Sequence, residues 1–276
     1  MGSLAPLRSA PSAYPHRVLD LHCHLLPGID DGPPDVEVSV QLARQAEDEG
    51  VRVIAATPHC RDDHPGVVPA ELGDRCAALS ETLAAENVFV RVVPAGEADL
   101  VWALEASDED LRLVSYAQRG TDLLLETPYS PLPSRFEDLL FQLTVRGYRL
   151  LLAHPERNPT FQQDPARVVE LVRRGYLLQV TASSLTRSPK GSRSGRLANQ
   201  LVGDGFVHVL ASDAHGPAAP GRATLNEGRA AAASLVGRRR ARWMVDTAPA
   251  AIIAGQPVPK PPPLAPRKRG LRRLTS

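Results

Sequence analysis

Two histidines, His22 and His24, lie one position apart in the segment LDLHCHLLPGIDDGPPD, residues 19–35. Side chains alternate along a strand, so residues at i and i+2 share a face and both imidazoles can bind one metal ion. Cys23 then points to the opposite face, where a thiol packs as a small buried hydrophobe. The turn that follows carries Asp30 and Asp31. From the residue types alone, either aspartate can be a metal ligand or a simple turn former.

Other residues that commonly bind metals follow further apolar runs, at the point where each run ends. They are His59 and Cys60 in IAATPHC, Glu97 in VVPAGEADL, Glu126 in DLLLETPY, His154 in LLLAHPERN, and Asp213 and His215 in HVLASDAH. A buried imidazole or carboxylate must be paired or coordinated, and no structural requirement puts one at nearly every strand end. The set therefore predicts a site for more than one metal ion. Histidine and carboxylate ligands suit Mn²⁺, Fe²⁺, Zn²⁺ or Mg²⁺ without selecting one of them.

Such a metal site indicates phosphoryl chemistry, because divalent ions at close range activate a water molecule and bind the oxygens of a phosphoryl group. Arginine binds the non-bridging phosphate oxygens through two parallel hydrogen bonds. Arg157 lies three residues after His154, and Arg222 lies seven residues after His215 in a Gly/Pro/Ala loop. Both arginines are therefore candidate phosphate-binding residues.

The elements that must position these residues are short apolar runs that alternate with helical patterns. We expect strands at residues 18–23, 51–56, 88–93, 122–126, 148–153, 176–180 and 207–211, and helices at 35–49, 69–86, 134–146, 165–173 and 193–202. This alternation predicts an α/β fold of parallel strands covered by helices, with its active site at the carboxyl ends of the strands. A closed barrel and an open sheet both fit, although no GxGxxG or Walker A motif follows a strand.

The bulk composition places few limits on partners. The chain has 276 residues, 43% of them hydrophobic, and a net charge of +1, which gives no indication of a nucleic-acid partner. Three cysteines without CxxC spacing, and the lack of a long apolar run or signal peptide, predict a cytoplasmic protein without a transmembrane helix. We expect a flexible arm at residues 1–17, one domain at 18–255, and a basic, proline-rich disordered tail at 256–276.

The motifs DLHCHLLPGIDDGP, TPHC, GEA, LLLETPYSPLP, LLAHPERN and ASDAH occur in this order. In that order they resemble the PHP (polymerase and histidinol phosphatase) superfamily. Within it, they are similar to the bacterial manganese-dependent protein-tyrosine phosphatases of capsule and exopolysaccharide operons. The HxH motif marks the superfamily, whereas LPGIDDGP together with HPERN is more specific to the tyrosine-phosphatase branch. The resemblance extends from about Val18 to Gly255.

The resemblance implies a distorted (β/α)₇ barrel with Mn²⁺ as two or three ions at the carboxyl ends of its strands. It implies three ligand sets, which are His22, His24, Glu126 and Asp213; Glu97 and His154 with a bridging carboxylate; and Asp31, His59 and His215. Arg157 and Arg222 would bind the phosphate, and a metal-bound hydroxide would attack it without a covalent phospho-enzyme. The implied substrate is a phosphotyrosyl protein, namely the tyrosine-rich tail of a bacterial tyrosine kinase that controls polysaccharide synthesis.

The sequence argues against two other classes of hydrolase and leaves two alternative functions. A cysteine phosphatase needs an arginine six residues after its nucleophile, but the three cysteines are followed there by Ile29, Gly66 and Thr82. A serine hydrolase is excluded because Arg193 stands at the centre of GSRSG. Histidinol-phosphate phosphatase, which shares the superfamily, and a non-catalytic binding module tethered by the basic tail remain as alternatives. The sequence leaves open the substrate protein, the metal, the oligomeric state, the role of the tail, and whether residues 185–195 close over the site.

Overall fold

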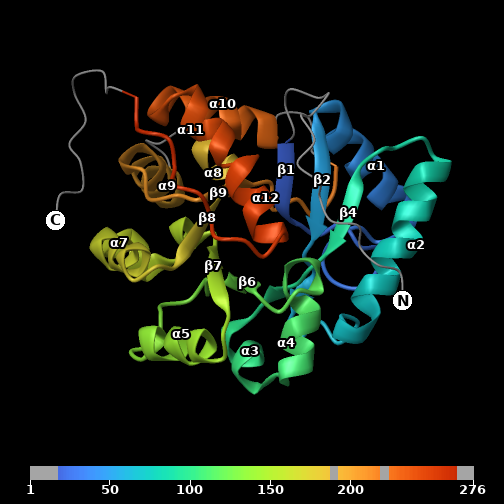
Figure 1. Cartoon of the computed structure of the whole chain (residues 1–276), viewed down its shortest axis with the longest axis horizontal. Coiled ribbons are helices and arrows are strands. Elements are labelled where there is room, and N and C mark those ends of the chain that lie inside the picture. The colour runs from blue at the N-terminus through green and yellow to red at the C-terminus, as the bar shows by residue number, and fades with distance from the viewer. Residues whose placement is uncertain (1–17, 187–191, 218–223, 266–276) are drawn as a thin grey trace.

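The computed structural model describes residues 18–186, 192–217 and 224–265. The strands in this part are β1 (Val18–Cys23), β2 (Val51–Ala56), β3 (His59–Cys60), β4 (Arg91–Pro94), β5 (Glu97–Ala98), β6 (Asp122–Glu126), β7 (Arg149–Ala153), β8 (Leu177–Thr181) and β9 (Val209–Ala211). They form two sheets, β1-β2-β4 and β3-β5-β6-β7-β8-β9, in which every pairing is parallel. The predicted α/β fold with parallel strands is therefore confirmed, and Figure 1 shows helices placed around the outside of both sheets.

The two sheets are continuous at one junction, because β3 follows β2 and β5 follows β4 after a two-residue interruption. Across this junction the backbone N–H of Ala95 donates to the Ala56 carbonyl at 3.1 Å. The N–H of Glu97 donates to the Pro58 carbonyl at 2.9 Å. The two short strands were not expected from the sequence, and they bring His59 and Glu97 into register as neighbours.

A second junction joins β1 to the segment that follows β9. The Asp213 N–H donates to the His22 carbonyl at 2.8 Å, and the His24 N–H donates to the Ala214 carbonyl at 2.9 Å. The carboxyl ends of the first and the last strand therefore lie side by side, although almost 190 residues separate them in the sequence. This contact brings the HCH and SDAH motifs together.

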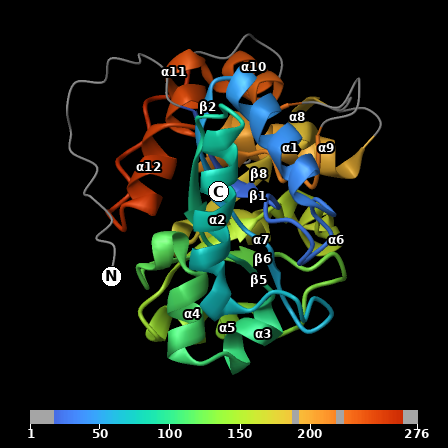
Figure 2. The same cartoon turned by 90° about the vertical axis from the view of Figure 1, so that its right-hand side faces the viewer.

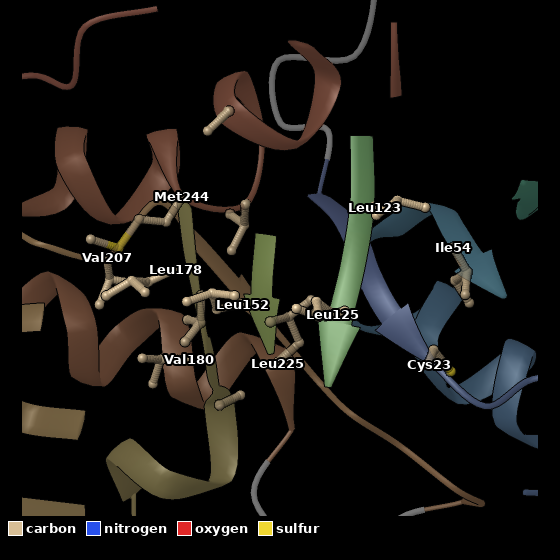
Figure 3. Close-up of a cluster of buried hydrophobic side chains, with 14 of the residues drawn as sticks. Cys23, Ile54, Leu123, Leu125, Leu152, Leu178, Val180, Val207, Leu225 and Met244 are labelled. Atoms are coloured by element: carbon tan, nitrogen blue, oxygen red, sulfur yellow. The ribbon is translucent and has the colours of Figure 1, made fainter. Parts of the chain in front are cut away.

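The strands are apolar on both faces, as parallel strands covered by helices must be. In β6, Leu123 and Leu125 belong to one buried cluster while Leu124, between them, belongs to the other. Figure 3 shows part of the first cluster, in which Leu152 of β7 lies near Leu178 of β8 and side chains from the C-terminal helices. Because side chains on both faces of these strands are buried, the strand sequences are continuous runs of leucine and valine.

The five predicted helices lie within a few residues of their expected ends. They are α1 (Val36–Asp48), α2 (Leu72–Ala85), α5 (Phe136–Val145), α7 (Pro165–Arg173) and α9 (Arg193–Asp204). Other described helices were not predicted, namely α3 (Leu100–Glu105), α4 (Asp108–Val114), α6 (Pro159–Gln163), α8 (Ala182–Thr186), α10 (Leu225–Val236), α11 (Arg238–Trp243) and α12 (Thr247–Ile253). Most of these span only one or two turns, too few for a 3.6-residue period to emerge. None of the described helices is long and apolar enough to cross a bilayer.

Helix α1 shows how local sequence fixes the loop that carries the double aspartate. Asp35 caps this helix, because its carboxylate accepts a hydrogen bond from the Val38 N–H at 2.9 Å. Glu37 adds a negative charge in the first turn, where the helix dipole favours it. The preceding residues are thus confined to the turn between β1 and α1. Figure 2 shows α1 beside α2, and these two helices are in contact.

The start of the expected disordered tail packs on the domain. Val258 and Leu264 lie against the main hydrophobic cluster, and the Pro262 carbonyl accepts a hydrogen bond from Arg240 Nη1 at 2.9 Å. This part of the segment was expected to be disordered, but its apolar side chains between the prolines pack against the domain. Residues 1–17 and 266–276 lie outside the described part of the chain.

Candidate metal centre and phosphate site

All nine side chains predicted as metal ligands meet at the carboxyl ends of the strands. His22 lies in β1, His24 just after it, Asp31 in the turn before α1, His59 in β3, Glu97 in β5, Glu126 at the end of β6, His154 after β7, and Asp213 and His215 after β9. Four groups have ligand atoms within 4.8 Å of one another: His24, Asp31, His59 and His215; His22, His154 and Asp213; His22, His24 and Glu97; and His59, Glu97 and Glu126. These groups agree in part with the sets that the resemblance implies. Asp31, His59 and His215 lie together, with His24 beside them, and His22 and His24 share one group. That group contains Glu97, whereas Glu126 lies with His59 and Glu97, and Asp213 lies with His22 and His154.

Glu97 lies at the centre of this arrangement. Its carboxylate is fully buried and lies 2.9 Å from His154 Nε2, 3.2 Å from His22 Nε2 and 3.1 Å from His59 Nδ1. Burial opposes ionisation of this carboxyl, but the charge of His22 and the hydrogen bond from His154 outweigh it and hold its pKa well below the usual range. An ionised carboxylate among three imidazoles can bridge two cations.

The histidines of the centre lie in a strongly negative environment. Burial lowers the pKa of His22, but the charges of Glu97 and Asp213 outweigh this effect and raise its pKa to about 8. At His24 the bonds to Asp30 and Glu97 raise the pKa to about 10. The centre as formed by the protein alone therefore favours added positive charge.

The chemistry of the donors fits a metal. Among the residues that the structure describes, His154 Nδ1 is buried and makes no hydrogen bond, and His59 Nδ1 and Glu97 Oε2 lie 3.1 Å apart without forming one. Buried polar atoms without a partner are costly, and natural proteins rarely keep them unless a water or an ion completes the site. A divalent cation bound by these imidazole and carboxylate groups would supply that partner.

Two buried residues orient the histidines, and the sequence patterns did not identify their roles. Gln179 Oε1 lies 3.1 Å from His22 Nδ1, and Asp30 Oδ2 lies 2.7 Å from His24 Nδ1. Both oxygens accept a hydrogen bond from a protonated Nδ1, which leaves each Nε2 free to face the centre. Gln179 is a buried amide in the middle of β8, between Leu178 and Val180, and this was the signal that could have revealed it.

The two adjacent aspartates have different surroundings. Asp30 is almost fully buried and also accepts hydrogen bonds from the backbone N–H groups of Gly32 and His59. Asp31 is 53% exposed, and its Oδ1 lies 3.3 Å from His215 Nε2 and 3.6 Å from His59 Nε2. Asp31 therefore faces the centre from its open side, whereas Asp30 fixes the turn and an imidazole.

Arg157 lies directly beside the centre, on the short helix η3 (Pro155–Arg157). Its Nη2 is 2.6 Å from Asp213 Oδ2 and donates to Thr181 Oγ1 at 3.2 Å, and its Nη1 donates to the Tyr129 hydroxyl at 2.8 Å. Burial lowers its pKa, but the Asp213 charge outweighs this and keeps the guanidinium protonated. A cavity of about 730 Å³ opens beside it, lined in part by Asp213 and His215. Arg222, the second predicted phosphate-binding residue, lies outside the described residues.

Another cation near the centre was not predicted. Arg61 Nη1 lies 3.4 Å from both oxygens of Glu126, on the loop that follows β3. Burial raises the pKa of Glu126, and the charge of Glu97 adds to this effect. The charge of Arg61 lowers the pKa of Glu126 and so offsets part of this rise. The side chain of Arg61 is 31% exposed.

Comparisons with known proteins identify the family. A family model described as capsular polysaccharide synthesis, CpsB/CapC, matches residues 18–254. The chain belongs to this family. It is 32% identical over 198 residues to tyrosine-protein phosphatase YwqE of Bacillus subtilis, covering 72% of this chain and 77% of the relative. It is 27% identical, with the same coverage, to the putative tyrosine-protein phosphatase CapC of Staphylococcus aureus.

Solved structures agree with this family. A chain from a crystallographic study of YwqE from Bacillus subtilis and CpsB from Streptococcus pneumoniae, called there unique metal-dependent tyrosine phosphatases, superposes with a TM-score of 0.74. The match covers 90% of this chain and 100% of that one at 29% identity. A structure from work that engineered organophosphate hydrolysis into a lactonase template shares 17% identity and a TM-score of 0.50, and so shows likeness of fold alone.

Proposed function

We propose that this member of the CpsB/CapC family is a metal-dependent phosphatase that hydrolyses phosphotyrosine on a protein. The observation that carries the proposal is the position of Arg157, whose guanidinium contacts Asp213 at the edge of the His/carboxylate centre. A phosphate ester bound to both would have its non-bridging oxygens between a fixed fork of N–H donors and the cations of the centre. The family relatives named as tyrosine-protein phosphatases support this choice of substrate.

The proposed ligands are the nine clustered side chains, His22, His24, Asp31, His59, Glu97, Glu126, His154, Asp213 and His215. When bound, divalent ions there would polarise the phosphoryl group and activate water for attack. Mn²⁺, as two or three ions, is the proposed metal, and Fe²⁺, Zn²⁺ and Mg²⁺ fit the same donor types. We also propose that the two connected sheets act as one distorted (β/α)₇ barrel around this centre.

The chain's own residues supply binding and orientation. Arg157 holds the phosphate oxygens, and Tyr129 and Thr181 keep its guanidinium in place. Gln179 and Asp30 hold the tautomers of two imidazoles, so that the centre does not reorganise during the reaction. Tyrosine leaves more readily than serine because the pKa of its phenol is near 10.

The structure offers no competing nucleophile among the cysteines. Cys23, Cys60 and Cys76 are all buried, and burial raises the pKa of each thiol, that of Cys76 to about 12. A cysteine phosphatase needs a thiolate near neutral pH. Buried, unpaired thiols also agree with the cytoplasm as the proposed location, and the proposed protein substrate is a bacterial tyrosine kinase of polysaccharide synthesis.

The test compares three substrates on the full chain, stripped with a chelator and reloaded with Mn²⁺. We expect metal-restored hydrolysis of a phosphotyrosyl peptide, much slower release from the same peptide carrying phosphoserine, and little from histidinol phosphate. A preference for histidinol phosphate would transfer the protein to the small-molecule branch of the superfamily. Inactivity on all three substrates would favour the alternative that the protein is a non-catalytic binding module.

A further inference from the structure

Tyr129 is a large aromatic side chain that remains exposed at the rim of the centre. It lies in the loop after β6, and 55% of its surface is accessible. Its ring lies 5.4 Å from the ring of His154, at an interplanar angle of 28°. Its hydroxyl accepts the hydrogen bond from Arg157 Nη1 at 2.8 Å. The hydroxyl of Tyr129 is therefore held by Arg157 and one face of its ring lies near His154, while much of the ring stays open to solvent.

A small cavity adjoins this ring and Arg157. It has a volume of about 290 Å³ and is lined by Tyr129, Arg157, Ser183, Ser184, Ser192 and Ser194. Arg157 and Ser183 line both this cavity and the larger cavity that reaches Asp213 and His215. A phosphate held by Arg157 at the centre would thus have an aromatic wall and a hydroxyl-lined hollow next to its ester oxygen. The volume is sufficient for a phenol ring and the start of a peptide backbone.

We propose that Tyr129 and this serine-lined cavity form the subsite for the aryl leaving group, in which the substrate's tyrosyl ring packs on the ring of Tyr129. The inference rests on the proposed phosphatase function and adds the residue that makes the site prefer aryl esters. Two aromatic rings prefer an offset or edge-to-face contact, and the open part of Tyr129 permits either. The serine hydroxyls can donate to peptide carbonyls on either side of the phosphotyrosine.

A second role for Tyr129 would be merely to position Arg157 through its hydroxyl. The two roles make different predictions, because the hydroxyl and the ring can be removed separately. Tyr129→Phe removes the bond to Arg157 and keeps the aromatic wall. Tyr129→Leu removes both. Phe141→Leu is a matched control, since Phe141 is 61% exposed on α5 and takes no part in the centre.

The experiment measures binding of phenylphosphonate and of methylphosphonate to the full Mn²⁺-loaded chain by calorimetry. We expect the wild type and Phe141→Leu to bind phenylphosphonate more tightly. In Tyr129→Leu this preference should fall about 2- to 10-fold, the contribution of one aromatic pair, while Tyr129→Phe should keep it. With a phosphotyrosyl peptide, the loss in Tyr129→Leu should appear mainly in KM.

Equal weakening of both phosphonates in Tyr129→Leu and Tyr129→Phe would overturn the subsite and leave Tyr129 as a positioning residue. An unchanged preference in Tyr129→Leu would also overturn it, while hydrolysis of phosphotyrosine would still stand. Failure of the wild type to bind either phosphonate or to release phosphate from aryl esters would instead overturn the proposed function, and the subsite with it. Melting temperature and bound manganese, measured for each variant, exclude misfolding as the cause.

Discussion

Replacing Arg157 with alanine separates phosphate binding from metal binding. Arg157 is not among the clustered ligand atoms, but it contacts three side chains at the edge of the centre: Asp213, Tyr129 and Thr181. The substitution therefore removes the proposed phosphate contact and leaves all nine candidate ligands in place. Catalysis should be lost while the metals remain bound.

The magnitude follows from the donors that are lost. A preorganised donor to developing negative charge is worth about 100- to 1000-fold in rate, so we expect kcat/KM for a phosphotyrosyl peptide to fall by about this factor. A second effect concerns stability without metal. The Asp213 side chain is only 2% exposed and loses a cation at 2.6 Å. Breaking a buried ion pair costs about 3–5 kcal/mol, and bound Mn²⁺ should reduce this cost.

The assay combines steady-state kinetics, metal content by mass spectrometry, and urea unfolding with and without Mn²⁺. Arg75→Ala serves as the matched control, because Arg75 is 40% exposed and forms a surface ion pair with Glu71 at 2.8 Å. The control should change neither turnover nor metal content. Unchanged turnover in Arg157→Ala would refute the phosphate contact. Loss of the metals together with activity would show that Arg157 supports the centre itself.

Three further changes test the orientation of the ligands, a partly buried imidazole and the packed tail. Gln179→Leu should weaken Mn²⁺ binding about 10- to 100-fold, because His22 loses the acceptor that fixes its tautomer; equal affinity by titration would remove that role. His208 Nδ1 accepts the Leu178 N–H at 3.2 Å, and burial, with Arg240, lowers its pKa to about 4 from 6.5. The unfolded chain therefore binds more protons between these values, so stability should fall by about 2 kcal/mol from pH 8 to pH 5. His208→Gln should show a smaller fall in urea unfolding, and an identical pH dependence would contradict this. Deleting residues 256–276 should lower the free energy of unfolding by about 2 kcal/mol through loss of the packed Val258 and Leu264, whereas deleting 266–276 should not. Turnover on a small aryl phosphate should survive both deletions. Equal melting temperatures of the two shortened chains would show that the packed segment contributes nothing to stability.

The positions of the candidate ligands could be predicted from the sequence because parallel strands deliver their carboxyl ends to one edge. His154 and Asp213 end apolar runs, and both adopt the positive φ, 35° and 52°, that few residues other than glycine tolerate. Such strained backbone persists where the surrounding structure holds it, often at functional sites. The sequence did not show this backbone geometry. The residue types at the strand ends were sufficient to predict the cluster, because parallel strands bring those ends together.

The residues that orient or border the centre could not be predicted in the same way. Gln179 contacts His22 across 157 residues of sequence, and Arg61 contacts Glu126 across 65. Such contacts depend on how side chains from distant segments meet, and no local period records them. The resemblance favoured Asp31, which does face the centre. The burial of its neighbour Asp30 became visible only in the folded turn.

The central claim is that the nine clustered side chains hold the metals that this phosphatase uses. The most direct measurement is anomalous diffraction at the manganese edge from crystals of the active, Mn²⁺-loaded chain. We predict two or three anomalous peaks within the cluster, at least one of them next to Glu97 and the nearest within reach of a phosphate bound to Arg157. An active enzyme whose only peaks lay outside the cluster would contradict the account.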